Sequence, residues 1–590
     1  MASGSRDRNG DSEWLLAKDG LKLLINNKGK EAEDLFLKYP ESLVMFSGYS
    51  FAVFMDALMS FEEEKLTKAI TTLKEVERRC NTKGWFKIVR NKMFGSTEEE
   101  PLLTETLETQ IILADSQVCL AILVFLQQDI SGYLKAGWVL RKAWKLYQST
   151  YSDLLNLYTG EIGPLNFPDP TLASRSSDSV VRNERAILSS NDTAFDLKPI
   201  SNGKTSDRPL SKKVIIRLMN AVTFGYGMLQ LGVSLLPPAL LRLTSFLGLS
   251  GSRSHGLACL MYSRLGVDMR APLATLSLLW YHCIVRPYYA LDGTNVQAGA
   301  RVAEMLIHES REEFGESALF LFFRGRLCRL NSDIPSALTA FQASVKNSTQ
   351  REIKLLSLHE VGWCYLIQLD FQNSESNFAF LATWSRWSRP FYSYIACICK
   401  GSRSALGDYS VLEEMIVNIR TSVKGNQLDE FLTRRALCFP SKEDFATCSP
   451  RFWKLFVYEM LYLWNSLASC TKENLLRIIS DCDLESPTEE PMKGVAKLIQ
   501  GACYLILGRT LEARSILREC IESRNEITQK SQPRDGHILA FAQYELASIL
   551  VETPETQEEG RKLLQQTTNL KDYDFEDRLT VRVSSLLRHG

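Results

Sequence analysis

A pattern of small and large residues recurs along the 590 residues of this chain at a fixed spacing. Each copy has a small residue in one apolar segment, a second small residue twelve positions later, and a large residue four positions after that. Looser copies lie at Val124 and around Tyr544. Apolar residues recur at i, i+3, i+4 and i+7 within the segments, which predicts α-helices. The first two positions of the five clear copies are Gly20 and Ala32, Ala57 and Ala69, Gly325 and Ala337, Gly362 and Ser374, and Gly501 and Ala513.

The packing of paired helices explains this spacing. Two antiparallel helices joined by a tight turn approach closely only where their side chains are small, and large residues one turn further on fill the groove against the next pair. The pattern is that of the tetratricopeptide repeat, whose period is about 34 residues. Gly325 and Gly362 are 37 residues apart, so longer turns are expected. We therefore predict an all-α fold, an α-solenoid of tetratricopeptide-type helix pairs, and its apolar middle suggests that the stack closes on itself.

Changes in composition along the chain predict six regions. The longest interruption is rich in Ser, Asp, Asn and Pro, which is typical of a disordered loop and offers sites for control by phosphorylation. The regions are a disordered N-terminus (1–11), N-terminal helix pairs (12–162), the disordered Ser-rich loop (163–211), an apolar helical block (212–295), central repeats (296–422), and C-terminal repeats with a closing helix (423–590).

Charge and cysteine usage exclude several functional classes. The 69 Lys and Arg residues balance 69 Asp and Glu residues, so no global field attracts nucleic acid. The 14 cysteines form no CxxC motif, and the six histidines are not grouped with cysteine pairs. We therefore predict no metal and no cofactor, with cysteines serving as small buried apolar residues. The polar first residues predict no secretory signal peptide, and hence a cytoplasmic protein, with association with an organelle surface left open.

The run from residue 218 to 241 contains no charged residue and is long enough to span a membrane. It also contains Asn220, Gln230 and the pair Pro237 and Pro238, and prolines break a helix. A helix surrounded by other helices would be equally apolar. We favour a buried helix, and a membrane contact or lipid pocket in residues 217–290 remains the alternative.

The glycine-rich stretch 248–256 is the best sequence candidate for catalysis, but it lacks the residues that a catalytic site requires. It does not match the phosphate-binding pattern GxxxxGK[ST], and no strand precedes it. His255 could act as a general base, yet no nucleophile with an orienting acid accompanies it in the sequence. We therefore predict that the chain is not an enzyme and has no catalytic residues.

The inner face of the predicted central repeats is the best candidate for partner binding. Arginine and aromatic residues at such positions are typical of binding hot spots. A neighbouring helix or the long loop filling the same space is an equally good interpretation, and the residues would then be core. The predicted groove residues are Phe322, Arg326, Arg329, His359 and Trp363.

Two more specific binding modes find little support. The equivalent positions of the repeats carry no Asn, so a carboxylate clamp for chaperone tails is not expected. Trp384, Trp387 and the intervening arginine resemble a surface for stacking nucleic-acid bases, but a packed joint between repeats is the better interpretation for a chain without net charge.

Two blocks of sequence resemble a known family. Residues 234–257 (SLLPPALLRLTSFLGLSGSRSHGL) and the terminal FEDRLTVRVSSLL (575–587) are similar to the tetratricopeptide repeat protein 39 family, most of all to its C-type member. Its relatives include fungal Iml-type proteins associated with the mitochondrial outer membrane and with inclusion-body clearance. The resemblance extends from about Trp14 to Leu587 and implies an all-helical repeat protein without catalytic residues.

Together these observations predict a non-catalytic scaffold or adaptor that binds protein partners through its concave groove. Organelle or cilium assembly is the setting in which such repeats are often found. The alternative is a lipid-binding or peripheral membrane protein that uses the apolar block at 217–290.

Overall fold

The computed structural model describes most of the chain, including nearly all of the predicted repeats. Much of the Ser-rich loop, the pair Pro237 and Pro238, and Trp387 lie outside the described residues, so predictions made for them stay predictions. The described residues are 10–60, 62–83, 103–126, 130–169, 183–184, 186–188, 210–236, 248–289, 291–292, 297–385, 388–403, 409–421, 427–445, 448–483, 489–528 and 535–589.

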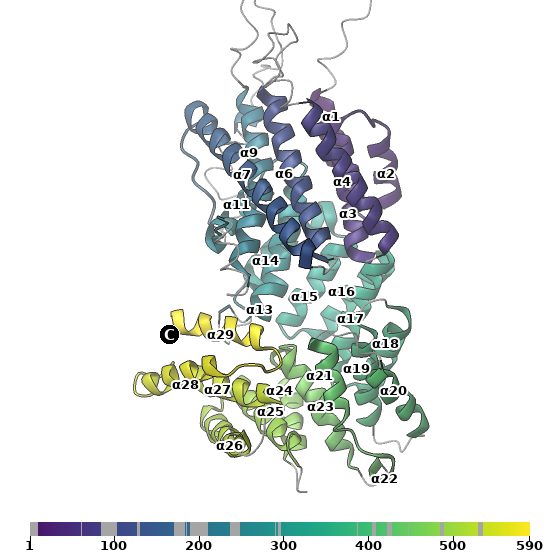
Figure 1. Cartoon of the computed structure of the whole chain (residues 1–590), viewed down its shortest axis with the longest axis vertical. Coiled ribbons are helices and arrows are strands. Elements are labelled where there is room, and N and C mark those ends of the chain that lie inside the picture. The colour runs from purple at the N-terminus through teal and green to yellow at the C-terminus, as the bar shows by residue number, and fades with distance from the viewer. Residues whose placement is uncertain are drawn as a thin grey trace, which may run out of the picture. The chain divides into compact units, whose positions relative to one another are not determined.

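The described residues form helices and no strand, which confirms the all-α prediction (Figure 1). They belong to two compact units: unit 1 comprises Met1–Trp280 with Met305–Phe320, and unit 2 comprises Tyr281–Glu304 with Leu321–Gly590. This division does not follow the six predicted regions, whose boundaries stay predictions. The helices of unit 1 are α1 (Gly10–Ile25), α2 (Gly29–Leu37), α3 (Leu43–Ser60), α4 (Glu63–Lys83), α6 (Leu103–Leu126), α7 (Ile130–Glu161), α9 (Lys212–Ser234), α11 (Arg253–Leu265) and α12 (Ala271–Trp280).

Unit 2 begins with the π-helical turn η2 (Tyr281–Val285) and the short α13 (Arg286–Tyr288). Helices α14 (Ala300–Phe314) and α15 (Ala318–Leu330) contribute residues to both units. The remaining elements are α16 (Ile334–Asn347), α17 (Arg351–Ile367), α18 (Phe371–Trp384), α19 (Arg389–Gly401), α20 (Tyr409–Thr421), α21 (Gln427–Ala436), α22 (Lys442–Phe445), α23 (Pro450–Leu463), η3 (Leu467–Ser469), α24 (Lys472–Cys482), α25 (Met492–Ile506), α26 (Thr510–Thr528), α27 (Gly536–Leu550), α28 (Gln557–Asn569) and α29 (Glu576–His589).

The repeated small–large spacing marks real helix contacts. A Cβ atom on Gly325 would lie 2.6 Å from the ring of Phe341, and one on Gly362 would lie 2.9 Å from that of Phe378. The small residue at the twelve-residue offset also touches its partner, because Ser374 Oγ donates to the carbonyl oxygen of Gly362 at 3.2 Å. The large residue therefore packs on the glycine of its own pair, in addition to any contact with the next pair.

The first pair shows both contacts at once. A Cβ atom on either Gly20 in α1 or Gly48 in α3 would collide with the ring of Phe36 in α2. Phe36 is 1% exposed, so its ring is enclosed by the two neighbouring helices. This arrangement extends the stack from one helix pair to the next, as expected of a solenoid.

Residues far apart in the sequence meet within each unit. In unit 1, Lys18 Nζ donates to Val267 O at 2.9 Å, and Ser317 Oγ donates to Ile25 O at 2.6 Å. In unit 2, Arg582 Nη2 donates to Tyr288 O at 3.1 Å, and α13 is thereby joined to α29. Each unit thus joins its first helices to its last ones.

Helix α9 is the centre of unit 1. Its residues pack against α6, α7 and α11, and 83% of its most apolar 18-residue window is buried. Among the residues that the structure describes, three helices are long and apolar enough by length and composition to cross a membrane, namely Leu43–Ser60, Leu103–Val124 and Lys212–Ser234, of which α9 is the most enclosed. For residues 218–234 the structure therefore shows the buried helix, while 237–241 lie outside the described residues.

Candidate interaction surfaces and buried polar clusters

The predicted groove residues come from the first helices of two consecutive pairs in unit 2. Phe322 and Arg329 lie on α15, and Trp363 lies on α17. These three side chains are buried, with Trp363 fully enclosed. Arg326 and His359 are partly buried. The structure brings the five side chains together, but none of them lies open to solvent.

The two arginines of this set share one carboxylate. Arg326 Nη1 lies 2.9 Å and Arg329 Nη1 lies 2.6 Å from Glu360 Oε2. Burial by itself would raise the pKa of Glu360, but the two guanidinium groups lower it to about 2. Both guanidinium groups that could have recognised a partner therefore already pair with a carboxylate inside the unit.

A turn of the same chain occupies the space in front of these side chains. This turn, which we call the inner turn, comprises residues 464–470 between α23 and α24. Its Trp464 stacks on Trp363 with ring centroids 5.9 Å apart. Its Ser466 Oγ accepts a hydrogen bond from Arg329 Nη2 at 2.8 Å. The inner turn thus contacts Trp363 and Arg329, and a partner at these two residues would have to displace it. The binding role of the five groove residues stays a prediction.

The inner turn was not predicted from the sequence, although one local signal was present. Asn465 follows the last turn of α23 and has a left-handed φ of 53°, a conformation that Asn tolerates at the end of a helix. Its Nδ2 donates to Pro287 O at 2.9 Å. Asn465 indicates a turn, but no local feature of the sequence predicts which distant helices that turn contacts.

His255 has a cysteine neighbour that the sequence did not suggest. His255 Nε2 lies 3.6 Å from Cys259 Sγ, one helical turn away on α11. Burial raises the pKa of the Cys259 thiol and lowers that of His255. The thiol is fully buried, and aromatic rings of Tyr151, Phe167 and Tyr226 surround the imidazole. A neutral, enclosed thiol is a poor nucleophile, so the pair is best explained as packing.

Of the 14 cysteines, ten are buried and four are partly buried. This agrees with the prediction that they serve as small apolar residues.

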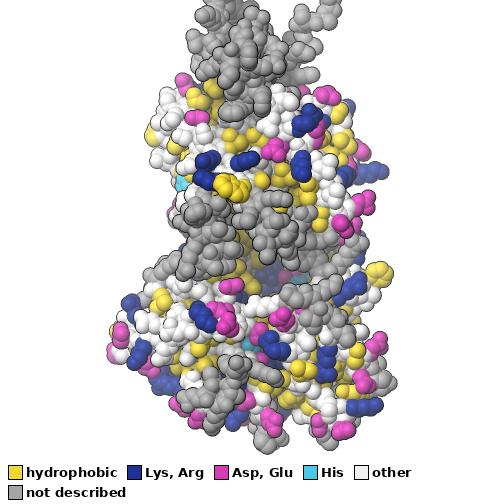
Figure 2. All heavy atoms as spheres, in the orientation of Figure 1, with side chains coloured by type: hydrophobic (Ala, Val, Ile, Leu, Met, Phe, Trp, Pro, Cys, Tyr) yellow, Lys and Arg dark blue, Asp and Glu magenta, His cyan; other side chains and the backbone are white. Residues whose placement is uncertain are grey.

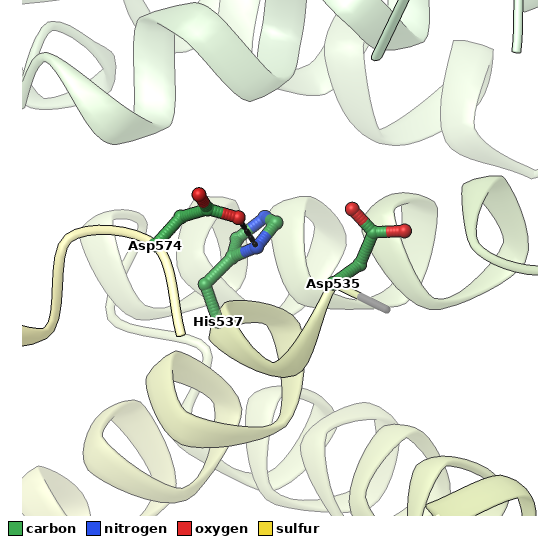
Figure 3. A group of neighbouring side chains, drawn as sticks. All are labelled: Asp535, His537 and Asp574. Carbon is green, nitrogen blue, oxygen red and sulfur yellow. Dashed lines mark ion pairs between the residues drawn. The ribbon is translucent and has the colours of Figure 1, made fainter. Parts of the chain in front are cut away.

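One cluster in unit 2 combines three potential metal ligands. Asp535 and His537 begin α27, and Asp574 precedes α29; their ligand atoms lie within 4.8 Å of one another (Figure 3). His537 Nδ1 lies 3.7 Å from Asp574 Oδ2, and its Nε2 lies 3.2 Å from Glu459 Oε1. The four residues come from three distant segments, around residues 459, 536 and 574, so spacing in the sequence could not have revealed the cluster.

Arginines already neutralise this cluster. Arg435 is 1% exposed, and its guanidinium lies 2.5 Å from Glu459 Oε1 and 3.3 Å from Asp535 Oδ1. Arg434 pairs with Asp574. A cation bound about 4 Å from a guanidinium would be repelled by roughly 4 kcal/mol per unit charge at an effective dielectric constant of about 20. The arrangement therefore favours an ion-pair network over a divalent metal.

A comparison with known protein families supports the interpretation of the helix pairs as tetratricopeptide-type repeats. A profile of the family described as Iml2/Tetratricopeptide repeat protein 39 matches residues 18–507. The chain belongs to this family. The matched span contains the block at 234–257, whereas 575–587 lies beyond it, so that part of the resemblance and the similarity to the C-type member stay predictions. Membership in the Iml2/Tetratricopeptide repeat protein 39 family indicates a tetratricopeptide-type role in protein interaction.

Proposed function

We propose that this member of the Iml2/Tetratricopeptide repeat protein 39 family is a non-catalytic scaffold whose protein partners contact its outer helix faces. The observation that supports the proposal is the inner turn: Trp464 stacks on Trp363, and Ser466 accepts a hydrogen bond from Arg329, so these two predicted groove residues already have partners within the chain. A rigid stack loses little conformational freedom when it binds, which favours recognition by its outer surface.

The outer surface offers suitable side chains. Figure 2 shows Lys and Arg intermixed with Asp and Glu, with apolar side chains between them, on the visible face. On α18, Trp384 is 56% exposed and Phe380 is 46% exposed, with ring centroids 6.1 Å apart. Exposed tryptophan is the residue type most enriched in binding hot spots.

Proximity labelling in cells tests the proposal. The full chain would be compared with Trp384→Ala, which changes the outer face, and with Arg326→Gln, which changes the predicted groove. We expect Trp384→Ala to lose labelled partners and Arg326→Gln to retain them at equal protein abundance. If only Arg326→Gln changed the partner list while its thermal stability was normal, the groove residues Phe322, Arg326, Arg329, His359 and Trp363 would be the binding site.

The cellular setting of the scaffold is a further part of the proposal. We propose cytoplasmic residence, at an organelle surface or in cilium assembly, because helical repeats often serve such assemblies. Imaging of the full chain with organelle and ciliary markers tests this, and a purely diffuse distribution in ciliated cells would contradict it.

A lipid-binding or peripheral membrane protein that uses residues 217–290 is the alternative. In the structure, α9 would have to leave its neighbours before its apolar side chains could reach a membrane. Resistance of the protein to carbonate extraction from membranes would favour the alternative, and a fully extractable protein would favour the scaffold.

A further inference from the structure

Two buried arginines on α29 carry more positive charge than their surroundings balance. Arg578 and Arg582 lie one helical turn apart and are 5% and 4% exposed. Among the described residues, neither guanidinium forms an ion pair with a carboxylate, in contrast to the paired Arg329 and Arg435.

Neutral groups hold the two side chains in place. Arg578 donates to Leu463 O and, at 3.0 Å, to Asn465 Oδ1, while its guanidinium lies 4.8 Å from the centre of the Tyr288 ring. Arg582 Nη2 donates to Tyr288 O at 3.1 Å. The Nε atoms of both arginines are buried and have no hydrogen-bond partner. Each guanidinium thus keeps an unused donor, and leaving a buried donor unpaired is costly.

One carboxylate interacts with both arginines at longer range. Glu545 accepts a hydrogen bond from Tyr462 Oη at 2.7 Å. Burial raises the pKa of Glu545, and the two arginines only partly oppose that effect. Burial and the charge of Arg582 lower the pKa of Arg578 to about 9. Two guanidinium groups thus lie near a single carboxyl group, so positive charge exceeds negative charge around these side chains.

We propose that Arg578 and Arg582 bind a small oxyanion of the size and charge of phosphate, between α29, α13 and the end of α23. Guanidinium groups are the donors best suited to the oxygens of such an ion, and each of the two arginines keeps an unused Nε donor. The low exposure of both side chains excludes a bulky phosphorylated macromolecule. The ion would tie α29 to α13, and so strengthen the contact that closes unit 2.

Calorimetric titration of the purified full chain with inorganic phosphate tests the assignment, with sodium chloride at matched ionic strength as reference. We expect saturable binding and a raised midpoint of thermal unfolding. Arg582→Gln should weaken binding at least tenfold. Arg518→Gln is the matched control, because Arg518 is exposed on α26 and pairs with Glu559, and it should bind phosphate like the unaltered protein.

A second variant keeps the test decisive if Arg582→Gln fails to fold. Glu545→Gln removes the nearby negative charge while its amide oxygen can still accept from Tyr462, so phosphate should bind several-fold more tightly. Unchanged or weaker binding by Glu545→Gln, or no saturable binding by the unaltered protein, would overturn the site. Glycerol 3-phosphate represents a lipid headgroup; tighter binding of this ester than of phosphate would overturn the assignment to a free ion.

Discussion

The indole rings of Trp363 and Trp464 lie nearly parallel, with an angle of 18° between their planes and 5.9 Å between their centroids. A residue on the first helix of a repeat thus faces a turn that lies about one hundred residues further along the chain. This contact places Trp363, one of the five predicted groove residues, in the core of unit 2.

Trp363→Ala is expected to lower the free energy of unfolding of unit 2 by about 3–5 kcal/mol, because it removes a fully buried indole and leaves a cavity. Trp384→Ala is the control, since that side chain is mostly exposed and its loss should change stability by about 0.5 kcal/mol or less. Urea unfolding followed by far-ultraviolet circular dichroism measures both. Equal losses for the two variants would contradict the burial of Trp363.

Gly20→Ala should destabilise unit 1 by roughly 1–3 kcal/mol, because the added methyl group would collide with the ring of Phe36. Gly232→Ala provides the opposite case in the same unit. Gly232 lies within α9 with no atom within 4 Å of an added Cβ, so alanine should stabilise the helix by roughly 0.5–1 kcal/mol. Thermal unfolding midpoints of the two variants should therefore move in opposite directions. A shift in the same direction would contradict the close packing of Phe36 on Gly20.

Glu360→Gln tests the acid dependence of unit 2. The pKa of Glu360 is lowered from 4.5 to about 2 by Arg326 and Arg329 against the opposing effect of burial. A carboxyl group with a lowered folded-state pKa contributes stability that is present above pH 4.5 and is lost as the pH falls towards 2. We therefore expect the variant to be less stable than the unaltered protein at pH 7, and the difference to shrink between pH 4.5 and pH 3.

Chemical unfolding at several pH values measures that difference. A gap between the two proteins that stayed constant or widened on acidification would show that the Arg326–Glu360–Arg329 cluster does not hold the carboxylate in its charged form.

Arg435→Met should lower the free energy of unfolding by roughly 3–5 kcal/mol, because it leaves the buried Glu459 without its cation. The same change removes the buried guanidinium that lies beside Asp535. Zinc should then bind Asp535, His537 and Asp574 and stabilise the protein. Thermal unfolding with and without zinc measures both effects. Zinc-dependent stabilisation of the unaltered protein, at a level equal to that of the variant, would disprove the charge argument.

Several features were predictable because they depend on local spacing. The twelve-residue offset between Gly362 and Ser374 and the ring of Phe378 four residues later all act within one helix pair, and the structure places them in contact. The buried state of α9 was also the favoured interpretation, because Asn220 and Gln230 lie within its otherwise apolar run, and 83% of its most apolar window is buried. Each of these inferences needs only helix geometry and side-chain size.

By itself, the sequence determined that the chain forms paired helices, because small residues in step allow close approach over short distances in the chain. Only the tertiary structure decided that Trp464 fills the face in front of Trp363, that Arg435 neutralises Glu459 and Asp535, and that α29 reaches α13. These contacts join residues that local spacing does not relate, and they arise because closing each unit buries apolar surface and satisfies charges that an open stack would leave in water.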